Sequence, residues 1–159
     1  MIPALLLMTG LVAVIALDLR RLLRTGSRLR LLRDPHSNDG GGTAALAMVL
    51  ASLKVPVPLD ELRSEVTDDD GRSNALRMVH AAERHGLDAR GVKLWGPAAF
   101  HGLSLPCVLH LHGDTFVVVE RVTAKHVTVI DAASGRHRVS HADLWARTSG
   151  VALLVTRHR

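Results

Sequence analysis

The sequence predicts an α+β domain in which N-terminal helices pack on an antiparallel sheet, preceded by one transmembrane helix. Three observations support this prediction. Residues 1–17 are apolar and uncharged, residues 42–86 carry apolar side chains at helical spacing, and residues 88–156 contain short apolar segments separated by turn residues. Because the helices precede the strands instead of alternating with them, the order favours α+β over α/β.

The apolar residues 1–17 predict a membrane anchor. At about 1.5 Å per residue they form about 25 Å of helix, and leucines up to Leu23 extend this toward the ~30 Å hydrocarbon core. Arginines follow the segment, so the positive-inside rule predicts a single-pass cell-membrane protein with a cytoplasmic C-terminal domain. A signal peptide cleaved near Ala16 is the alternative, although its positive charges would precede the apolar run.

The charge pattern divides the chain into an anchor at 1–24, a basic juxtamembrane linker at 25–38 and a domain at 39–157. Residues 18–33 alternate leucine with arginine, which predicts an interfacial stretch lying against anionic membrane lipids. A simple charged flank of the membrane span is a compatible alternative. The net charge of +5 is concentrated in this stretch, and aromatic residues are only 3% of the chain. We therefore expect no nucleic-acid partner.

The expected helices occupy the first half of the domain. Residues 42–53 are apolar on nearly all sides, which predicts a central helix, and residues 59–66 predict a short second helix. Ser73 is a suitable N-cap for a third helix that ends at Gly86.

The expected strands follow in the second half. Pro97 and residues 140–146 predict two short helical pieces among them. The strands are expected at 88–94, 105–112, 115–122, 125–131 and 150–156. The chain has one cysteine, which excludes an internal disulfide framework, and it has no phosphate-binding loop, so it is not itself an ATP-driven exporter.

Residues 38–50 run from a polar loop into the first predicted helix and contain the sequence Asp39-Gly40-Gly41. A cysteine in place of Gly40 would put a thiol at the start of a helix, where the partial positive charge lowers its pKa. Gly40 has no side chain, so the segment has the frame of a nucleophile site without the nucleophile.

Six segments in order resemble the peptidase C39 domain, a cytoplasmic cysteine protease that precedes bacteriocin and lanthipeptide ABC exporters. The resemblance implies a papain-like fold and a relation to the cleavage of leader peptides after a double glycine. The segments are Asp39–Gly41, Val57–Arg63, Asp70–Leu87, Leu105–His110, Phe116–Val119 and Ile130–Gly135.

The resemblance also implies that the catalytic set is incomplete. The family's nucleophile corresponds to Gly40, its base to Thr115 and its oxyanion-hole glutamine to Asp34. Only the aspartate that orients the imidazole is retained, as Asp131. Because cysteine proteolysis needs a thiolate, a base and oxyanion donors, we do not expect catalysis by the family's mechanism.

An active peptidase with rearranged residues would have to use Cys107 with His110 or His112 beside Asp131. Cys107 lies in an apolar run that predicts a buried strand, which argues against this alternative. His110 and His112 share a strand face, but no second ligand pair accompanies them, and we expect no metal and no cofactor.

The sequence thus predicts a membrane-anchored, catalytically inactive C39-like domain that binds a leader or substrate peptide beside a separate ABC exporter. Family members without the cysteine that hold substrate imply this role. A docking or regulatory subunit of a membrane complex is the alternative. The glycine run is expected to leave space where the thiol would stand, within a groove formed by Gly40, Gly41, Gly42, Thr115 and Asp131.

Overall fold

The computed structural model describes residues 28–34 and 38–158. The predicted anchor at 1–24 lies outside these residues. Within the described part of the chain, no helix combines the length and apolarity needed to cross a membrane.

One six-stranded antiparallel sheet forms the centre of the domain, with strand order β1-β6-β2-β3-β4-β5. The strands are β1 Leu87–Lys93, β2 Cys107–Leu111, β3 Thr115–Val122, β4 His126–Asp131, β5 Gly135–Ser140 and β6 Thr148–Arg157. The predicted α+β class and all five predicted strands are confirmed. β5 was not predicted, because its sequence is polar and it lies at an edge of the sheet, where less of it is buried.

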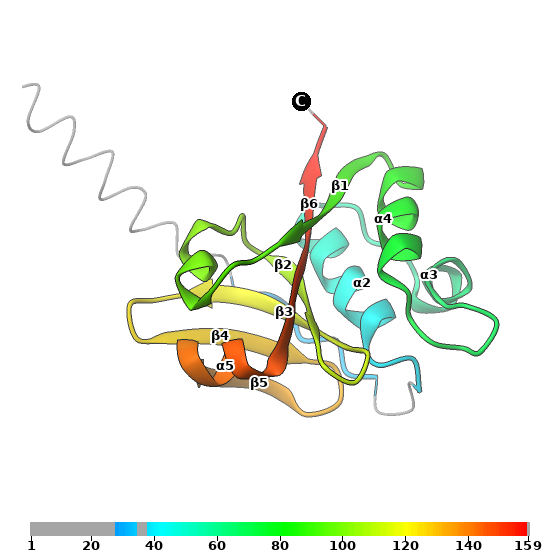
Figure 1. The fold of residues 1–159 in the computed structure, drawn as a ribbon. Coiled ribbons are helices and arrows are strands. Elements are labelled where there is room, and N and C mark those ends of the chain that lie inside the picture. Colours follow the sequence, from blue (N-terminus) through cyan, green and yellow to red (C-terminus); the bar gives the residue numbers. More distant parts are fainter. Residues whose placement is uncertain (1–27, 35–37, 159) are drawn as a thin grey trace, which may run out of the picture.

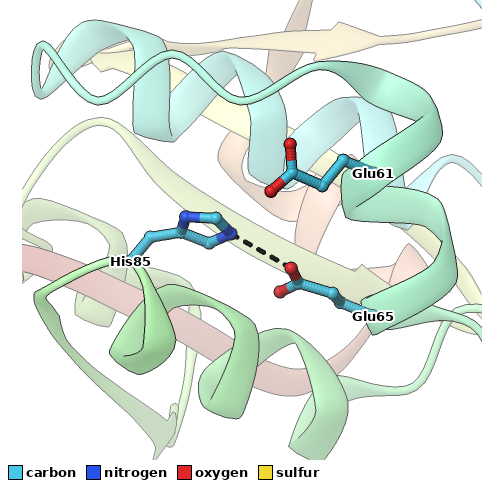
Figure 2. Close-up of side chains that lie close together, drawn as sticks. All are labelled: Glu61, Glu65 and His85. Carbon is cyan, nitrogen blue, oxygen red and sulfur yellow. Dashed lines mark hydrogen bonds and ion pairs between the residues drawn. The ribbon is translucent and has the colours of Figure 1, made fainter.

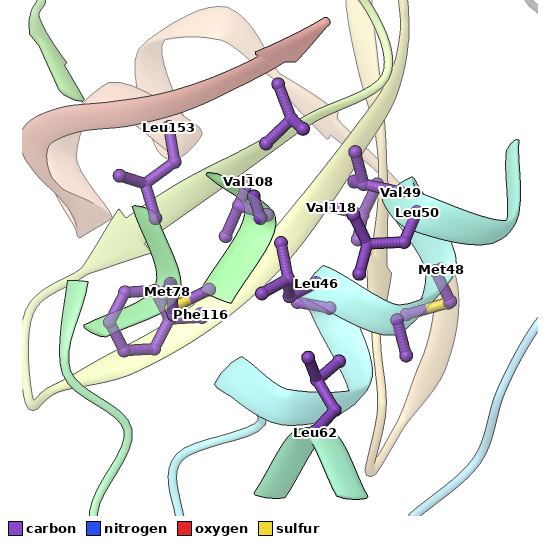
Figure 3. Packing of buried hydrophobic residues seen from close by; sticks show 14 of the residues in the cluster. Leu46, Met48, Val49, Leu50, Leu62, Met78, Val108, Phe116, Val118 and Leu153 are labelled. Atoms are coloured by element: carbon purple, nitrogen blue, oxygen red, sulfur yellow. The ribbon is translucent and has the colours of Figure 1, made fainter. Parts of the chain in front are cut away.

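Three helices cover one face of the sheet: α2 Gly42–Ser52, α3 Leu59–Val66 and α4 Ala75–Arg84 (Figure 1). Residues 42–50 are all buried because α2 lies between the sheet and the other two helices. Leu46 and Leu50 of α2 pack with Val108 and Val118 of the sheet (Figure 3). The predicted central helix is therefore confirmed.

The N-cap of α4 differs from the prediction. The side chain of Asn74 accepts hydrogen bonds from the backbone N–H groups of Leu76 (2.9 Å) and Arg77 (3.2 Å). Asn74 thereby satisfies two first-turn donors of the helix, which is the role that was predicted for Ser73. Ser73 is instead buried beside Gly42 at the start of α2.

The opposite face of the sheet is covered by two shorter elements, the 3₁₀ helix η1 Pro97–Gly102 and the helix α5 His141–Arg147. Both correspond to predicted helical pieces. Phe100 of η1 and Leu144 of α5 are buried in a second apolar cluster with the sheet residue Leu109. The sheet thus separates two hydrophobic cores.

Residues 28–34 form an arm that lies on the domain and is not a free linker. The N–H of Leu29 donates to Oε1 of Glu120 (2.7 Å), and Nη2 of Arg136 donates to the carbonyl of Leu29 (2.7 Å). Leu29 is buried, and Leu31 and Leu32 pack against the same core. These leucines therefore contact the protein, which corrects their predicted contact with lipid, and the packed domain includes residues before 39.

Candidate functional site at the start of α2

The glycine run at the start of α2 lies against the start of β3. Gly40 and Gly41 adopt φ angles of 78° and 82°, in the left-handed region that favours glycine, and Gly41 is the N-cap of α2. The carbonyl of Gly40 accepts a hydrogen bond from the N–H of Phe116 (2.9 Å). The structure therefore brings the predicted nucleophile position next to Thr115, the predicted position of the base.

The space around these glycines is filled by the chain itself. A Cβ atom on Gly40 would lie 2.2 Å from the carbonyl oxygen of Asp114, and one on Gly42 would lie 2.3 Å from the Ser73 side chain. At Gly41 the nearest atom would be the Phe116 carbonyl oxygen, at 3.2 Å. The expected vacancy in place of a thiol is therefore not present at Gly40 or Gly42.

Asp39 occupies the positive end of α2. Its buried carboxylate accepts hydrogen bonds from the N–H groups of Gly41 (2.8 Å) and Thr43 (3.3 Å), and from the Thr43 hydroxyl. An acidic side chain at a helix N-terminus is stabilised by the helix dipole and by these donors. In a cysteine protease a thiolate uses this field, whereas here a carboxylate of the same chain uses it.

Arg63 of α3 connects two acidic residues beside this helix end. Its guanidinium donates to Asp34 and lies 3.4 Å from Oδ2 of Asp39. The hydrogen bond to Asp34 raises the pKa of Arg63, an effect that burial opposes. Asp34 also donates its backbone N–H to the carbonyl of Ala132 (3.2 Å). An ionised carboxylate only accepts hydrogen bonds, so Asp34 supplies no side-chain donor for an oxyanion.

Thr115 and Asp131 lie on the second face of the sheet. They are two residues from Val117 and Val129, which both belong to the core cluster of that face, and side chains alternate along a strand. Thr115 is exposed. Oδ1 of Asp131 accepts hydrogen bonds from the N–H groups of Ala133 (2.7 Å) and Ser134 (3.2 Å), so Asp131 stabilises the turn between β4 and β5.

A pocket of about 260 Å³ opens beside Asp131, with an apolar floor and a polar rim. The floor consists of Leu111, Val117, Val129, Val139 and Leu144, and the rim of Asp131, Ser134, His137 and Arg147. Nε2 of His137 lies 2.9 Å from Oγ of Ser134. Such a combination is typical of sites that bind an apolar group and orient it with a few polar contacts. The sequence does not predict this pocket, because half of its rim comes from the β4–β5 turn and the unpredicted strand β5.

The alternative catalytic residues are not arranged for catalysis. Cys107 is fully buried in the second core, and this burial raises the pKa of its thiol to about 12. His110 projects from the other face of β2, where Nδ1 lies 2.7 Å from Oγ of Ser149 and the ring packs on Phe116. His112 is exposed beyond the end of β2. Since Cys107 and His110 lie on opposite faces of the sheet, they do not form a catalytic pair.

A cluster of Glu61, Glu65 and His85 has the residue types of a metal site and was not predicted. Their ligand atoms lie within 4.8 Å of one another (Figure 2). Nε2 of His85 lies 3.2 Å from Oε1 of Glu65, and Arg84 donates to the other oxygen of the same carboxylate (3.2 Å). Because Arg84 and His85 both contact the carboxylate of Glu65, these contacts join α3 to the end of α4.

Three helices on one face of an antiparallel sheet, with the central helix starting against the strand β3, define the class of papain-like peptidase domains. The chain belongs to the peptidase C39 family, whose model matches residues 32–159. No curated protein matches the chain.

Solved structures of the same family resemble this fold. A double glycine motif protease from an AMS/PCAT transporter, determined in complex with the leader peptide, is 27% identical with a TM-score of 0.77, covering 86% of this chain and 96% of its own. The peptidase domain of Streptococcus ComA, a bi-functional ABC transporter of a quorum-sensing pathway, is 19% identical to this chain, with a TM-score of 0.74. The match covers 82% of this chain and 100% of the ComA domain. The peptidase C39 like domain of a Vibrio parahaemolyticus toxin secretion ATP-binding protein is 21% identical to this chain, with a TM-score of 0.62. The match covers 74% of this chain and 97% of the Vibrio domain.

Proposed function

We propose that this protein is a membrane-anchored, catalytically inactive C39 peptidase-like domain that binds a leader or substrate peptide of an ABC-type export system. One observation carries the proposal: the helix start has no thiol and is tightly packed, yet a pocket beside Asp131 is open. A relative at 27% identity, a double glycine motif protease, has been determined with its leader peptide, which supports a peptide ligand for this fold.

The proposed inactivity follows from the groups that the site contains. Proteolysis by a cysteine protease requires a thiolate, a base near neutral pKa and donors for the oxyanion. Gly40 and Gly41 have no side chain, the hydroxyl of Thr115 is no base near pH 7, and Asp34 is paired with Arg63. The thiol of Cys107 is buried and its pKa is raised, so it does not substitute for the missing nucleophile.

Peptide binding needs shape and polar contacts, not a nucleophile. In the proposed complex an apolar side chain of the peptide enters the pocket over Val117 and Val129. Asp131 and Arg147 at the rim contact the polar groups beside it. The peptide backbone then follows the exposed Thr115 toward Gly40, while the pocket supplies most of the apolar burial.

The proposed membrane location depends on residues 1–17 and predicts a cytoplasmic domain beside a separate exporter. A reporter fused after Arg159 should be cytoplasmic, and the full chain should stay with membranes at high salt. Salt screens the attraction between arginine and lipid but does not release a buried apolar helix. Release by salt alone, or a mature N-terminus near Leu17, would contradict the anchor.

The peptide site is best tested by filling the pocket from its rim. Ser134→Trp places a bulky side chain in the pocket at an exposed turn position, whereas Gly41→Trp would be strained by its φ of 82°. Ser64→Trp, at an exposed position on α3, is the matched control. Affinity of the full chain for a labelled double-glycine leader peptide is measured by fluorescence anisotropy in mild detergent.

We expect Ser134→Trp to weaken leader binding about tenfold or more, which corresponds to about 1.4 kcal/mol. The melting temperature should not change, and Ser64→Trp should bind like the unaltered chain. Equal binding by both variants would place the peptide elsewhere. If the unaltered chain binds no leader, the role of a docking or regulatory subunit replaces the one proposed.

A further inference from the structure

A second, basic pocket lies where the N-terminal arm meets the β3, β4 and β5 strands. It has a volume of about 530 Å³ and four arginines in its lining against a single carboxylate. Its lining residues are Arg28, Glu120, Arg121, Thr128, Arg136, His137 and Arg138. They come from three neighbouring strands and from Arg28 of the arm, which is distant in sequence, so the basic character of this pocket arises only in the folded domain.

One of these arginines has a structural role. Arg136 donates to both carboxylate oxygens of Glu120 (2.9 Å each) and to the carbonyl of Leu29, while Glu120 accepts the N–H of Leu29. This pair neutralises itself and fixes the arm to the sheet. It forms the wall of the pocket, and its charges are not available to a ligand.

The other three guanidinium groups have no such hydrogen-bonded partner among the described residues, although the positive charge of Arg28 helps to lower the pKa of Glu120. Among the described residues, no hydrogen bond or ion pair reaches the side chains of Arg28, Arg121 or Arg138, and all three are exposed at the pocket. Like charges that converge on one cavity repel one another, and an anion placed among them removes this repulsion. Guanidinium groups match the geometry of phosphate oxygens in particular, because each presents a planar fork of donors.

We propose that this pocket binds a phosphate group, and that the phosphate is supplied by the headgroup of an anionic lipid. Arg28 at the pocket is preceded in the sequence by Arg20, Arg21 and Arg24 and by the apolar residues 1–17. A domain tethered by such a segment has its basic pocket a short distance from the membrane surface. The lipid source rests on the proposed membrane anchor, whereas the phosphate chemistry of the pocket does not.

The pocket is less suited to a nucleic acid. Bound single strands usually stack bases on aromatic side chains, and neither tryptophan nor phenylalanine lines this pocket. The three unpaired arginines are also gathered in one cavity, whereas a nucleic acid requires an extended row of charges. A single headgroup phosphate fits the compact arrangement better.

The test uses the full chain in dodecyl maltoside micelles and measures binding by microscale thermophoresis. Three probes are titrated: phosphatidylglycerol mixed into the micelles, phosphatidylcholine mixed in the same way, and inorganic phosphate. Arg121→Gln/Arg138→Gln removes two unpaired charges from the pocket. Arg77→Gln/Arg90→Gln removes the same charge from exposed positions on α4 and β1 and is the matched control.

We expect the unaltered chain and the control to prefer phosphatidylglycerol over phosphatidylcholine. The pocket variant should bind phosphatidylglycerol about 25-fold more weakly, since each of the two basic residues near an anionic surface contributes about fivefold. Equal affinity of the pocket variant and the control would overturn the site. Inorganic phosphate bound in preference to phosphatidylglycerol would overturn the lipid assignment. A further outcome is that salt releases the chain from membranes while Arg121→Gln/Arg138→Gln still weakens binding of phosphatidylglycerol. That result would contradict the membrane anchor and support the phosphate pocket.

Discussion

The carbonyl oxygen of Asp114 lies 2.2 Å from the position that a Cβ atom would take on Gly40. The turn between β2 and β3 therefore packs directly on Gly40, the predicted position of the nucleophile. The hydrogen bond from the Phe116 N–H to the Gly40 carbonyl holds the two segments in this position. A cysteine at position 40 would require the backbone of Asp114 to move, because its Cβ atom would overlap the Asp114 carbonyl oxygen.

This contact predicts that Gly40→Ala destabilises the domain more than a comparable glycine substitution. Gly71 has nearly the same φ, 75° against 78°, but no atom within 4 Å of an added Cβ. Both substitutions incur the backbone cost of about 1–2 kcal/mol, and only Gly40→Ala adds the steric clash, of about 1–3 kcal/mol. Urea unfolding of the full chain in mild detergent measures the difference. Equal free energies of unfolding for the two variants would show that the turn at Asp114 moves away from the added Cβ atom without destabilising the domain.

Gly42 and Ser73 form a second close pair, and their coupling is measurable. A Cβ on Gly42 would lie 2.3 Å from the Ser73 side chain, so Gly42→Ala should cost about 1–3 kcal/mol, although alanine normally favours a helix. Ser73→Gly removes the obstructing atoms, and the Ser73 hydroxyl has no hydrogen-bond partner among the described residues. The double variant should therefore recover most of the loss that Gly42→Ala causes. Additive effects in this double-mutant cycle would contradict the contact.

We expect the contacts of Glu120 that hold the arm on the sheet to weaken at acidic pH. Burial alone would raise the pKa of Glu120, but the hydrogen bonds from Arg136 and the Leu29 N–H, together with the positive charges of Arg136 and Arg28, outweigh burial and lower this pKa from its ordinary value. A lowered pKa means that the stabilisation is present above pH 4.5 and is lost as the pH falls through the folded-state value. Glu120→Gln should cost about 2 kcal/mol at neutral pH.

The difference in stability between Glu120→Gln and the unaltered chain should shrink as the pH drops below 4.5. The exposed Glu83→Gln on α4 is the control and should follow the unaltered chain. Chemical unfolding measured at several pH values between 3 and 7 provides the comparison. A difference that stays constant across this range would contradict the assigned role of the Glu120 carboxylate.

Cys107 should behave as a core residue. Its fully buried thiol, with a pKa raised to about 12, should resist a maleimide reagent at pH 7 in the folded chain and react once urea unfolds it. The stoichiometry is followed by mass spectrometry. Rapid labelling of the folded protein would contradict the buried position of Cys107 and support the alternative hypothesis that Cys107 is a nucleophile.

The helical half and the apolar strands were predictable because their buried positions carry apolar side chains, which form a pattern in the sequence. All of residues 42–50 are buried, and the sequence of α2 is therefore apolar on nearly every side of the helix. β5 carries arginine and histidine at an edge of the sheet, so its sequence has no apolar pattern to recognise. The role of Leu29 was misassigned for a related reason, since leucine between arginines looks the same whether it meets lipid or a protein core.

The assignment of Gly40, Thr115 and Asp131 to the family's catalytic positions rests on order and spacing in the sequence and stays a prediction. The packing of Gly40 on Asp114 and the ion pair of Asp34 with Arg63 could not be predicted, since these contacts join segments that are distant in sequence. The two pockets share this origin. Both are lined by residues of β5 and by residues of other strands, which only the register of the sheet brings together.

The central claim is that this domain binds a double-glycine leader peptide and leaves it intact. One sample tests both parts: the full chain in mild detergent is mixed with a fluorescent precursor peptide, anisotropy reports binding, and mass spectrometry of the same sample reports cleavage. We predict saturable binding and an intact peptide after prolonged incubation. Cleavage after the double glycine that disappears in a Cys107→Ala variant, or the absence of binding, would contradict the account.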